Sequence, residues 1–413
     1  MDLRLVLSFA VPVAFILLID YYAFQSVKTA FQHLSFKGYL FAGYWTITIL
    51  AVLSILTYRT IGYKFLPHGV GTFIGAFVAI SVLSKVVMIL FLLGEDMSRI
   101  VRFAISKFSA SPSSSTDIIT RSQFLNRLAI MTAAVPFGTL LYGIIANAYN
   151  YQLHRVKIRF TNLPEAFNGF RIVQLSDIHT GSFTRTEPIQ KAVETINRLN
   201  ADVILFTGDL VNNTADEMEG YLSIFSKLQA RLGVYSSTGN HDYGDYAQWS
   251  SKEAKEENFS RFIDVHRKLG WKLLMNEHHV FEKNGDKIAL IGLENWGAGR
   301  WSKYGKFEKA YRGTEEIPFK IMMSHDPSNW DAKIRPNFPD IDLTLSGHTH
   351  GAQFGIESKW LKWSPSQWVY KQWAGLYQEG TQYLYVNRGF GFIGYPGRIG
   401  ILPEITEITL VKA

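Results

Sequence analysis

The chain has 413 residues, of which 47% are apolar, enough for a large core and a second unit. Its net charge of +7 is uneven: residues 1–150 hold 11 Lys/Arg and 5 Asp/Glu, a net of +6, which leaves +1 for residues 151–413. So neutral a unit lacks the basic patch of a nucleic-acid-binding domain, and we expect no nucleic-acid partner. The absence of cysteine excludes disulfides, zinc–thiolate sites and cysteine nucleophiles.

Residues 1–150 contain four long apolar runs, at 3–19, 39–58, 70–93 and 128–148. Each is close to the roughly 20 residues that a helix needs to cross about 30 Å of hydrocarbon. Tyr and Trp gather near their ends, as in an aromatic belt. The pattern predicts four transmembrane helices in the cell membrane, with the bilayer as partner, rather than a buried soluble bundle. Lys85 in the third run must reach the interface or pair inside the bundle.

The basic residues between the runs indicate an orientation. The first and third connections together hold seven Lys/Arg, whereas the opposite side holds three, or six with the three that follow the fourth run. Because cytoplasmic loops carry an excess of Lys and Arg, the odd-numbered connections are expected to be cytoplasmic. This places residues 151–413 on the extracytoplasmic side, by a small margin.

Beyond residue 150 the pattern changes to that of a soluble α/β unit. A helix is predicted from Pro188, with apolar residues at positions 189, 192, 193, 196 and 199 on one face. Short apolar strands are predicted at 172–175, 203–207, 233–238, 287–293, 319–324, 341–345 and 382–386. The sequence therefore predicts a transmembrane region at 1–150 and an α/β domain at 151–413.

Five of these strands end in residues suited to binding a metal. The motifs are, in chain order, Asp177-x-His179, Gly208-Asp209, Gly239-Asn240-His241-Asp242, His325 and Gly347-His348-Thr349-His350. The carboxyl ends of strands are where α/β sheets place their sites, and glycine allows the backbone to turn sharply there. Imidazole and carboxylate together suit Mn, Fe or Zn better than Mg or Ca.

In order and spacing these motifs resemble the calcineurin-like metallophosphoesterases, over about residues 155–413. The pattern is most similar to their membrane-associated bacterial branch, which includes phosphodiesterases and UDP-2,3-diacylglucosamine hydrolases. The resemblance implies a β-sandwich flanked by helices. It also implies two divalent metal ions, Mn²⁺ before Zn²⁺ or Fe. Their ligands would be Asp177, His179 and His350 for the first ion, Asn240, His325 and His348 for the second, and Asp209 as the bridge.

The same resemblance implies a mechanism. A hydroxide that bridges the two ions attacks phosphorus, and His241 donates a proton to the leaving oxygen. Many relatives have an aspartate that orients this histidine where the chain has Asn212, which leaves the tautomer of His241 open. For Arg388, after the last predicted strand, a phosphate contact and a fold-stabilising role are both open.

The segment from Trp360 to Trp373 holds four tryptophans in 14 residues, with lysines between them. Such a surface suits a lipid or lipid-linked phosphoester, although packing of these tryptophans in the core explains them equally well. We therefore predict a membrane-anchored enzyme that hydrolyses a phosphodiester or pyrophosphate bond. One alternative is a non-catalytic membrane protein with a structural or sensing metal site. A transporter is a third hypothesis, disfavoured because Lys85 is expected to be the only charge within the spans.

Overall fold

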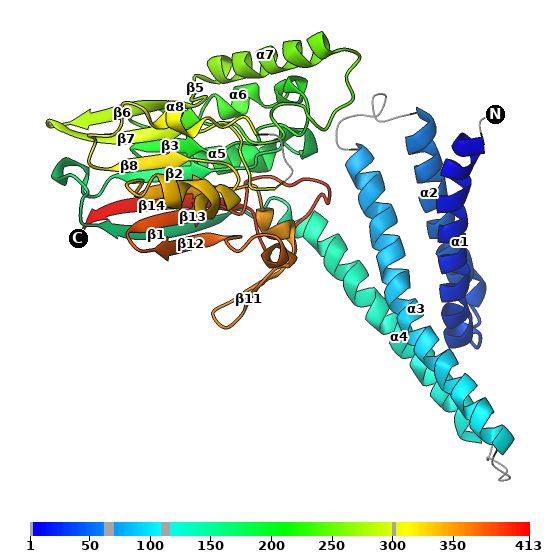
Figure 1. Cartoon of the computed structure of the whole chain (residues 1–413). Coiled ribbons are helices and arrows are strands. Elements are labelled where there is room, and N and C mark those ends of the chain that lie inside the picture. The colour runs from blue at the N-terminus through cyan, green and yellow to red at the C-terminus, as the bar shows by residue number, and fades with distance from the viewer. Residues whose placement is uncertain (1–2, 62–69, 109–115, 300–302) are drawn as a thin grey trace. The chain divides into compact units, whose positions relative to one another are not determined.

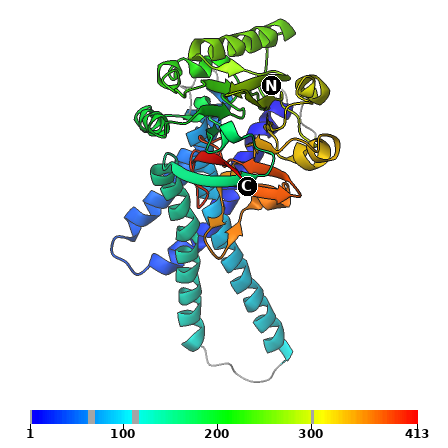
Figure 2. The same ribbon diagram turned by 90° about the vertical axis from the view of Figure 1, so that its left-hand side faces the viewer.

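The computed structural model describes residues 3–61, 70–108, 116–299 and 303–413, which divide into two compact units, Met1–Tyr142 and Gly143–Ala413. The first unit consists of the helices α1 (Leu3–Phe31), α2 (Lys37–Ile61), α3 (Val70–Phe108) and α4 (Thr116–Tyr142). By length and composition, four spans suffice to cross a membrane: Ala10–Phe31, Lys37–Thr57, Gly71–Lys107 and Phe124–Asn147. The helices α3 and α4 run side by side in opposite directions (Figures 1 and 2).

The first span continues past the end of the predicted run at 3–19 as far as Phe31, because a buried ion pair allows an acidic residue inside it. Asp20 of α1 forms an ion pair with Lys85 of α3, and both side chains are buried. The hydroxyl of Tyr44 in α2 also donates to the Asp20 carboxylate at 3.2 Å. Lys85 therefore pairs within the bundle, and the prediction that it is the only charge in the spans was wrong.

The second unit contains two six-stranded sheets (Figure 1). The first has the order β1 (Gln152–Phe160), β14 (Glu404–Lys412), β2 (Arg171–Leu175), β3 (Val203–Phe206), β4 (Val234–Ser236) and β5 (Lys272–Leu273). The second has the order β12 (Gly375–Glu379), β13 (Gln382–Val386), β9 (Leu343–Ser346), β8 (Lys320–Met323), β7 (Asp286–Gly292) and β6 (Glu277–Lys283). Strands β2 to β5 are mutually parallel, as are β7, β8, β9 and β13.

The sheets pack face to face because the faces of their central strands that meet are apolar. In β3, Val203 and Leu205 belong to the core between the sheets, whereas Ile204 and Phe206 face a second core. Each such buried side chain contributes about 1.5–3 kcal/mol. The second core lies under α5 (Glu187–Arg198), α6 (Leu222–Phe225) and α7 (Lys252–Leu269), and the outer face of the other sheet is covered by α8 (Phe307–Tyr311) and the π-helical turn at Trp330–Ile334. The predicted β-sandwich flanked by helices is confirmed.

Arg388, which follows β13, stabilises the fold. Its guanidinium is buried and forms ion pairs with Glu404 of β14 at 2.6 Å and with Glu357 at 2.5 Å. Burial opposes the charge of Glu404, but Arg388 outweighs it and lowers the pKa of that carboxyl to about 2. The pair links the two sheets, so a structural role explains Arg388.

We predict that Arg388→Ala destabilises the chain strongly, because Glu404 keeps a buried charge without its partner. The expected loss in free energy of unfolding is about 3–5 kcal/mol, measured as a lower Tm of the full-length protein in detergent. The matched control is Arg155→Ala, because Arg155 pairs with Glu407 while 69% exposed, and such a pair contributes at most about 1 kcal/mol. Equal Tm shifts in the two variants would contradict this account.

Candidate metal centre

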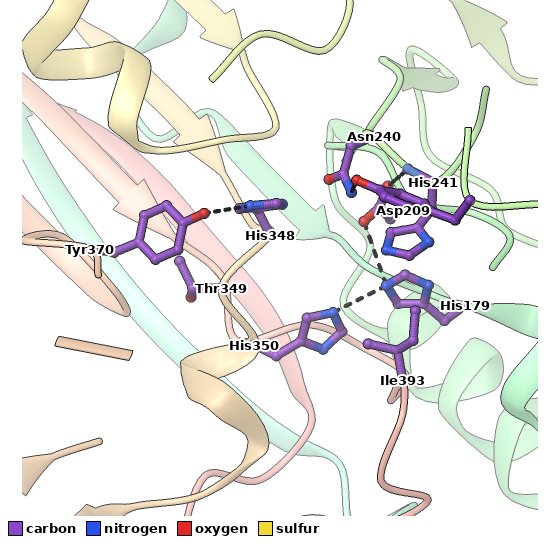
Figure 3. Close-up of a pocket in the computed structure, with 10 residues that line it drawn as sticks. His179, Asp209, Asn240, His241, His348, Thr349, His350, Tyr370 and Ile393 are labelled. Carbon is purple, nitrogen blue, oxygen red and sulfur yellow. Dashed lines mark hydrogen bonds and ion pairs between the residues drawn. The ribbon is translucent and has the colours of Figure 1, made fainter. Parts of the chain in front are cut away.

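The site lies where both sheets present the carboxyl ends of their parallel strands. Strands β2, β3 and β4 of one sheet and β8 and β9 of the other all lead into it. The residues that follow them meet around a pocket of about 300 Å³ (Figure 3). The pocket is lined by His179, Asp209, Asn240, His241, Tyr246, His348, Thr349, His350, Tyr370 and Ile393. Packing of the two sheets thus brings distant motifs together.

The backbone turns sharply at these strand ends. Of the ten described non-glycine residues with positive φ, five are predicted metal ligands: Asp177, His179, Asp209, His348 and His350, with φ between 49° and 70°. Such left-handed conformations are costly for residues with a side chain and tend to gather at functional sites. The strain is held by cross-strand hydrogen bonds, for example from the Asp177 N–H to the Gly208 carbonyl at 2.9 Å.

The first cluster consists of Asp177, His179 and His350, all buried. The Nε2 atoms of His179 and His350 lie 3.1 Å apart, and His350 Nε2 lies 3.2 Å from Asp177 Oδ1. Burial opposes the charge of Asp177, but the neighbouring imidazoles, His350 foremost, hold the pKa of its carboxyl below the ordinary value. Burial lowers the pKa of His179 well below its ordinary value, so this ring is neutral and able to bind a cation.

The second cluster consists of Asp209, His325 and His348. His325 Nε2 lies 3.0 Å from Asp209 Oδ2 and 3.2 Å from His348 Nδ1. Burial disfavours the charged form of His325, but the Asp209 carboxylate outweighs burial and raises the pKa of the imidazole to about 10. A metal ion that binds here would take the place of this proton.

Asp209 faces both clusters with one carboxylate oxygen. Its Oδ1 accepts a hydrogen bond from the His241 N–H at 2.9 Å, which fixes the carboxylate. Its Oδ2 lies 3.0 Å from His325 Nε2 in the second cluster and 3.6 Å from His179 Nε2 in the first. A single oxygen is therefore within reach of a cation in either cluster.

Asn240 presents an amide oxygen that suits a metal ligand. Its Nδ2 donates to the hydroxyl of Tyr246 at 2.9 Å. Its Oδ1 is buried and has no hydrogen-bond partner among the residues that the structure describes. An unpaired buried carbonyl oxygen is costly, and a cation would satisfy it.

The two histidines beside Asn212 have their tautomers fixed by it. His241 Nδ1 lies 2.7 Å from the backbone carbonyl of Asn212, so Nδ1 carries a proton and donates. His179 Nδ1 lies 3.1 Å from the Asn212 side-chain oxygen, which directs the Nε2 lone pair of His179 toward the first cluster. The backbone carbonyl of Asn212 thus orients His241 without an aspartate at this position.

Three residues without a predicted role also shape the site. Asp242 accepts hydrogen bonds from the N–H groups of Asp209, Leu210 and Gly239 at 2.8–2.9 Å, and burial raises its pKa to about 7. Tyr370 places its hydroxyl 2.7 Å from His348 Nε2 (Figure 3). The sequence did point to Asp242, because it belongs to the motif Gly239-Asn240-His241-Asp242. Tyr246 and Tyr370 had none, because packing of distant loops brings them to the pocket.

The fold and the site define a class of protein, in which membrane helices precede a phosphoesterase β-sandwich. Comparison with known proteins agrees with this class. Residues 3–148 match the family described as "Probable Calcineurin-like phosphoesterase, transmembrane domain", and residues 170–352 match "Calcineurin-like phosphoesterase". The chain is 30% identical over 305 residues to the uncharacterized metallophosphoesterase YkuE of Bacillus subtilis (strain 168), covering 71% of this chain and 98% of that protein. The chain belongs to the calcineurin-like phosphoesterases, a family of metal-dependent hydrolases, and is a membrane protein, as predicted.

Two further relatives have informative names. The chain is 33% identical over 297 residues to "Transmembrane protein with metallophosphoesterase domain" of Danio rerio. The aligned region covers 69% of this chain and 62% of that protein. It is 26% identical over 303 residues to the UDP-2,3-diacylglucosamine pyrophosphatase LpxG of Chlamydia trachomatis. That aligned region covers 61% of this chain and 88% of that protein.

We predict that Gly347→Ala strongly weakens metal binding, because there is no room for a Cβ at this position. The added atom would overlap Ser176 and the Asp177 carboxylate. Asp177 is held in place, since both its oxygens lie 3.0 Å from the His348 N–H. At about 100 times Kd, a metal stabilises a folded chain by about 2.7 kcal/mol, and we expect the variant to lose most of this gain.

The measurement is the rise in Tm when Mn²⁺ is added to the EDTA-treated full-length protein. The matched control is Gly220→Ala, because the Cβ added at Gly220 has no described atom within 4 Å. An equal Mn²⁺-induced rise in both variants would show that the Asp177 position does not matter for metal binding.

Proposed function

We propose that the chain is a membrane-anchored phosphoesterase that uses two divalent metal ions to hydrolyse a phosphodiester or pyrophosphate bond. The observation that carries this proposal is the position of Asp209 Oδ2, within 3.6 Å of a ligand atom of each cluster. The proposed ligands are Asp177, His179 and His350 for the first ion, Asn240, His325 and His348 for the second, and Asp209 for both. We propose Mn²⁺ as the native ion, with Zn²⁺ and Fe as alternatives.

The residues present fit such a pair of ions. Each cluster combines a carboxylate with imidazole nitrogens, and the buried Asn240 oxygen adds a neutral ligand. When bound, the two ions would supply Lewis acidity toward the phosphate oxygens and lower the pKa of a water molecule.

His241 is the proposed general acid. Its Nδ1 is committed to the Asn212 carbonyl, so Nε2 is the atom that holds the transferable proton. Its ring lies 5.0 Å from that of His179 and lines the pocket, which places it beside the proposed metal ligands. A histidine so placed protonates the leaving oxygen when the bond to phosphorus breaks.

The pocket and the tryptophan segment favour a lipid-linked substrate. A volume of about 300 Å³ accommodates a phosphoryl group and part of a headgroup, but not acyl chains. Trp373 is buried in the fold, whereas Trp360 is 95% exposed, so each explanation of the tryptophans holds for part of the segment. The relative LpxG is named for a diacylated sugar nucleotide, which also supports an amphiphilic substrate.

We test the function with the full-length protein, Mn²⁺ and bis-p-nitrophenyl phosphate. Asp209→Asn is expected to reduce hydrolysis to the uncatalysed background, because the amide has no negative charge and keeps a single oxygen, which the His241 N–H already engages. His241→Ala is expected to retain the Mn²⁺-induced rise in Tm and to lose about 10²–10⁴-fold in kcat. Metal-loaded wild-type protein that is inert on all phosphoesters would instead support the non-catalytic alternative.

We also propose that the phosphoesterase unit is extracytoplasmic, on the basis of the basic residues between the spans. A nucleotide-linked lipid would then be an improbable substrate, because such molecules are made in the cytoplasm. Protease added to intact spheroplasts is expected to cleave within residues 155–413. Complete protection that is lost only on lysis would place the unit in the cytoplasm.

A further inference from the structure

A group of exposed apolar side chains directly precedes the pocket residue Tyr370 in the sequence. It consists of Phe354, Ile356, Trp360, Leu361, Trp368 and Val369, each of which is exposed, Trp360 to 95% and Val369 to 76%. We call these six residues the aromatic patch. They belong to the hairpin of β10 (Ile356–Glu357) and β11 (Lys362–Trp363), which projects from the sheets in Figure 1, and to the turn of helix at Pro365–Trp368. Exposed apolar side chains gathered in this way mark a binding surface.

The aromatic patch is held by ordered structure. In the hairpin, Ile356 pairs with Trp363, and the Ser358 N–H donates to the Leu361 carbonyl at 2.9 Å across the turn. The ring of Trp363 makes edge contacts with Phe354 and Trp368, at centroid distances of 6.1 and 6.0 Å. The exposed tryptophans are therefore presented on a firm support rather than on a flexible loop.

The charges around the patch suit an anionic lipid surface. Lys359 is exposed at the tip of the hairpin, next to Trp360. The acidic residue of the hairpin, Glu357, is bound to Arg388 and so presents no free negative charge. An apolar surface with tryptophan and a basic edge is typical of segments that lie in the membrane interface.

The connection to the membrane limits where this patch can be. Residues 143–151 alone separate the end of α4 from the start of β1. Even fully extended, such a segment reaches only about 30 Å at roughly 3.3 Å per residue. The phosphoesterase unit therefore stays close to a bilayer, which is the nearest partner able to bury tryptophan.

We propose that the aromatic patch inserts into the interface of the bilayer in which the chain is anchored. The patch is continuous with the pocket, because Val369 is followed by Tyr370, which lines the pocket and contacts His348 at 2.7 Å. Insertion brings the pocket to the level of lipid headgroups. If the proposed function holds, on which this step rests, the substrate is a phosphoester in the headgroup of an amphiphile that stays in the membrane.

The absence of native cysteine allows a clean test of insertion in the full-length chain. We place a spin label at Trp360→Cys or, as a matched control, at Lys283→Cys on the exposed end of β6 in the same unit. The protein is reconstituted in vesicles of phosphatidylcholine with 30 mol% phosphatidylglycerol. Collision with a water-soluble nickel chelate and with oxygen, which concentrates in the bilayer, then reports depth.

Insertion predicts that the label at 360 is at least about threefold less accessible to the nickel chelate than the label at 283, and more accessible to oxygen. Equal accessibility at the two positions would overturn the proposal. Protection from both reagents that grows with protein density would also overturn it, because the patch would then contact a second copy of the chain.

A second measurement addresses the substrate class. Trp360→Ser is expected to leave hydrolysis of soluble bis-p-nitrophenyl phosphate unchanged and to lower hydrolysis of hexadecyl p-nitrophenyl phosphate in the same vesicles about tenfold. Ile263→Ser, which removes an exposed apolar side chain on α7, serves as the control and should change neither. Equal activity of Trp360→Ser and wild type on both substrates would refute the lipid assignment. Wild-type protein inert on both would refute the proposed function, while the spin labels still decide insertion.

Discussion

The structure depends on how the Asp209 carboxylate is held between two groups of imidazoles. One oxygen is fixed by the His241 N–H at 2.9 Å, and the other lies between His325 and His179. Buried carboxylates and imidazoles in this number are costly without compensating charge. Without a metal, protonated His325 compensates Asp209. Two cations, as proposed, would give all seven proposed ligands a partner. The sandwich makes this possible by bringing the carboxyl ends of strands from both sheets to one place.

Much of this arrangement was predictable, because the strands that lead to the site are short runs rich in apolar residues. Runs such as Val203–Phe206 are continuous in the sequence and end at the residues that line the pocket. Proposed ligands two residues apart, such as His348 and His350, project from one strand end into the two clusters. Short local patterns therefore predicted both the strands and the candidate ligands, and family membership is confirmed by comparison.

What the sequence did not predict depends on contacts between distant segments. The first span continues through Asp20 because Lys85 lies beside it, 65 positions further along the chain. The strands β1 and β14 pair in parallel from opposite ends of the unit, and β1 alternates charged with apolar residues, so it is not an apolar run. Tyr246 and Tyr370 reach Asn240 and His348 through loops whose courses are set by packing alone.

The central claim is that the chain binds two metal ions that share Asp209, and anomalous diffraction from Mn²⁺-loaded crystals of the full-length protein tests it most directly. The account predicts two peaks about 3.5–4 Å apart. One should lie among Asp177, His179 and His350, the other among His325, His348 and Asn240, with Asp209 Oδ2 contacting both. A single peak, or peaks away from these residues, would contradict it.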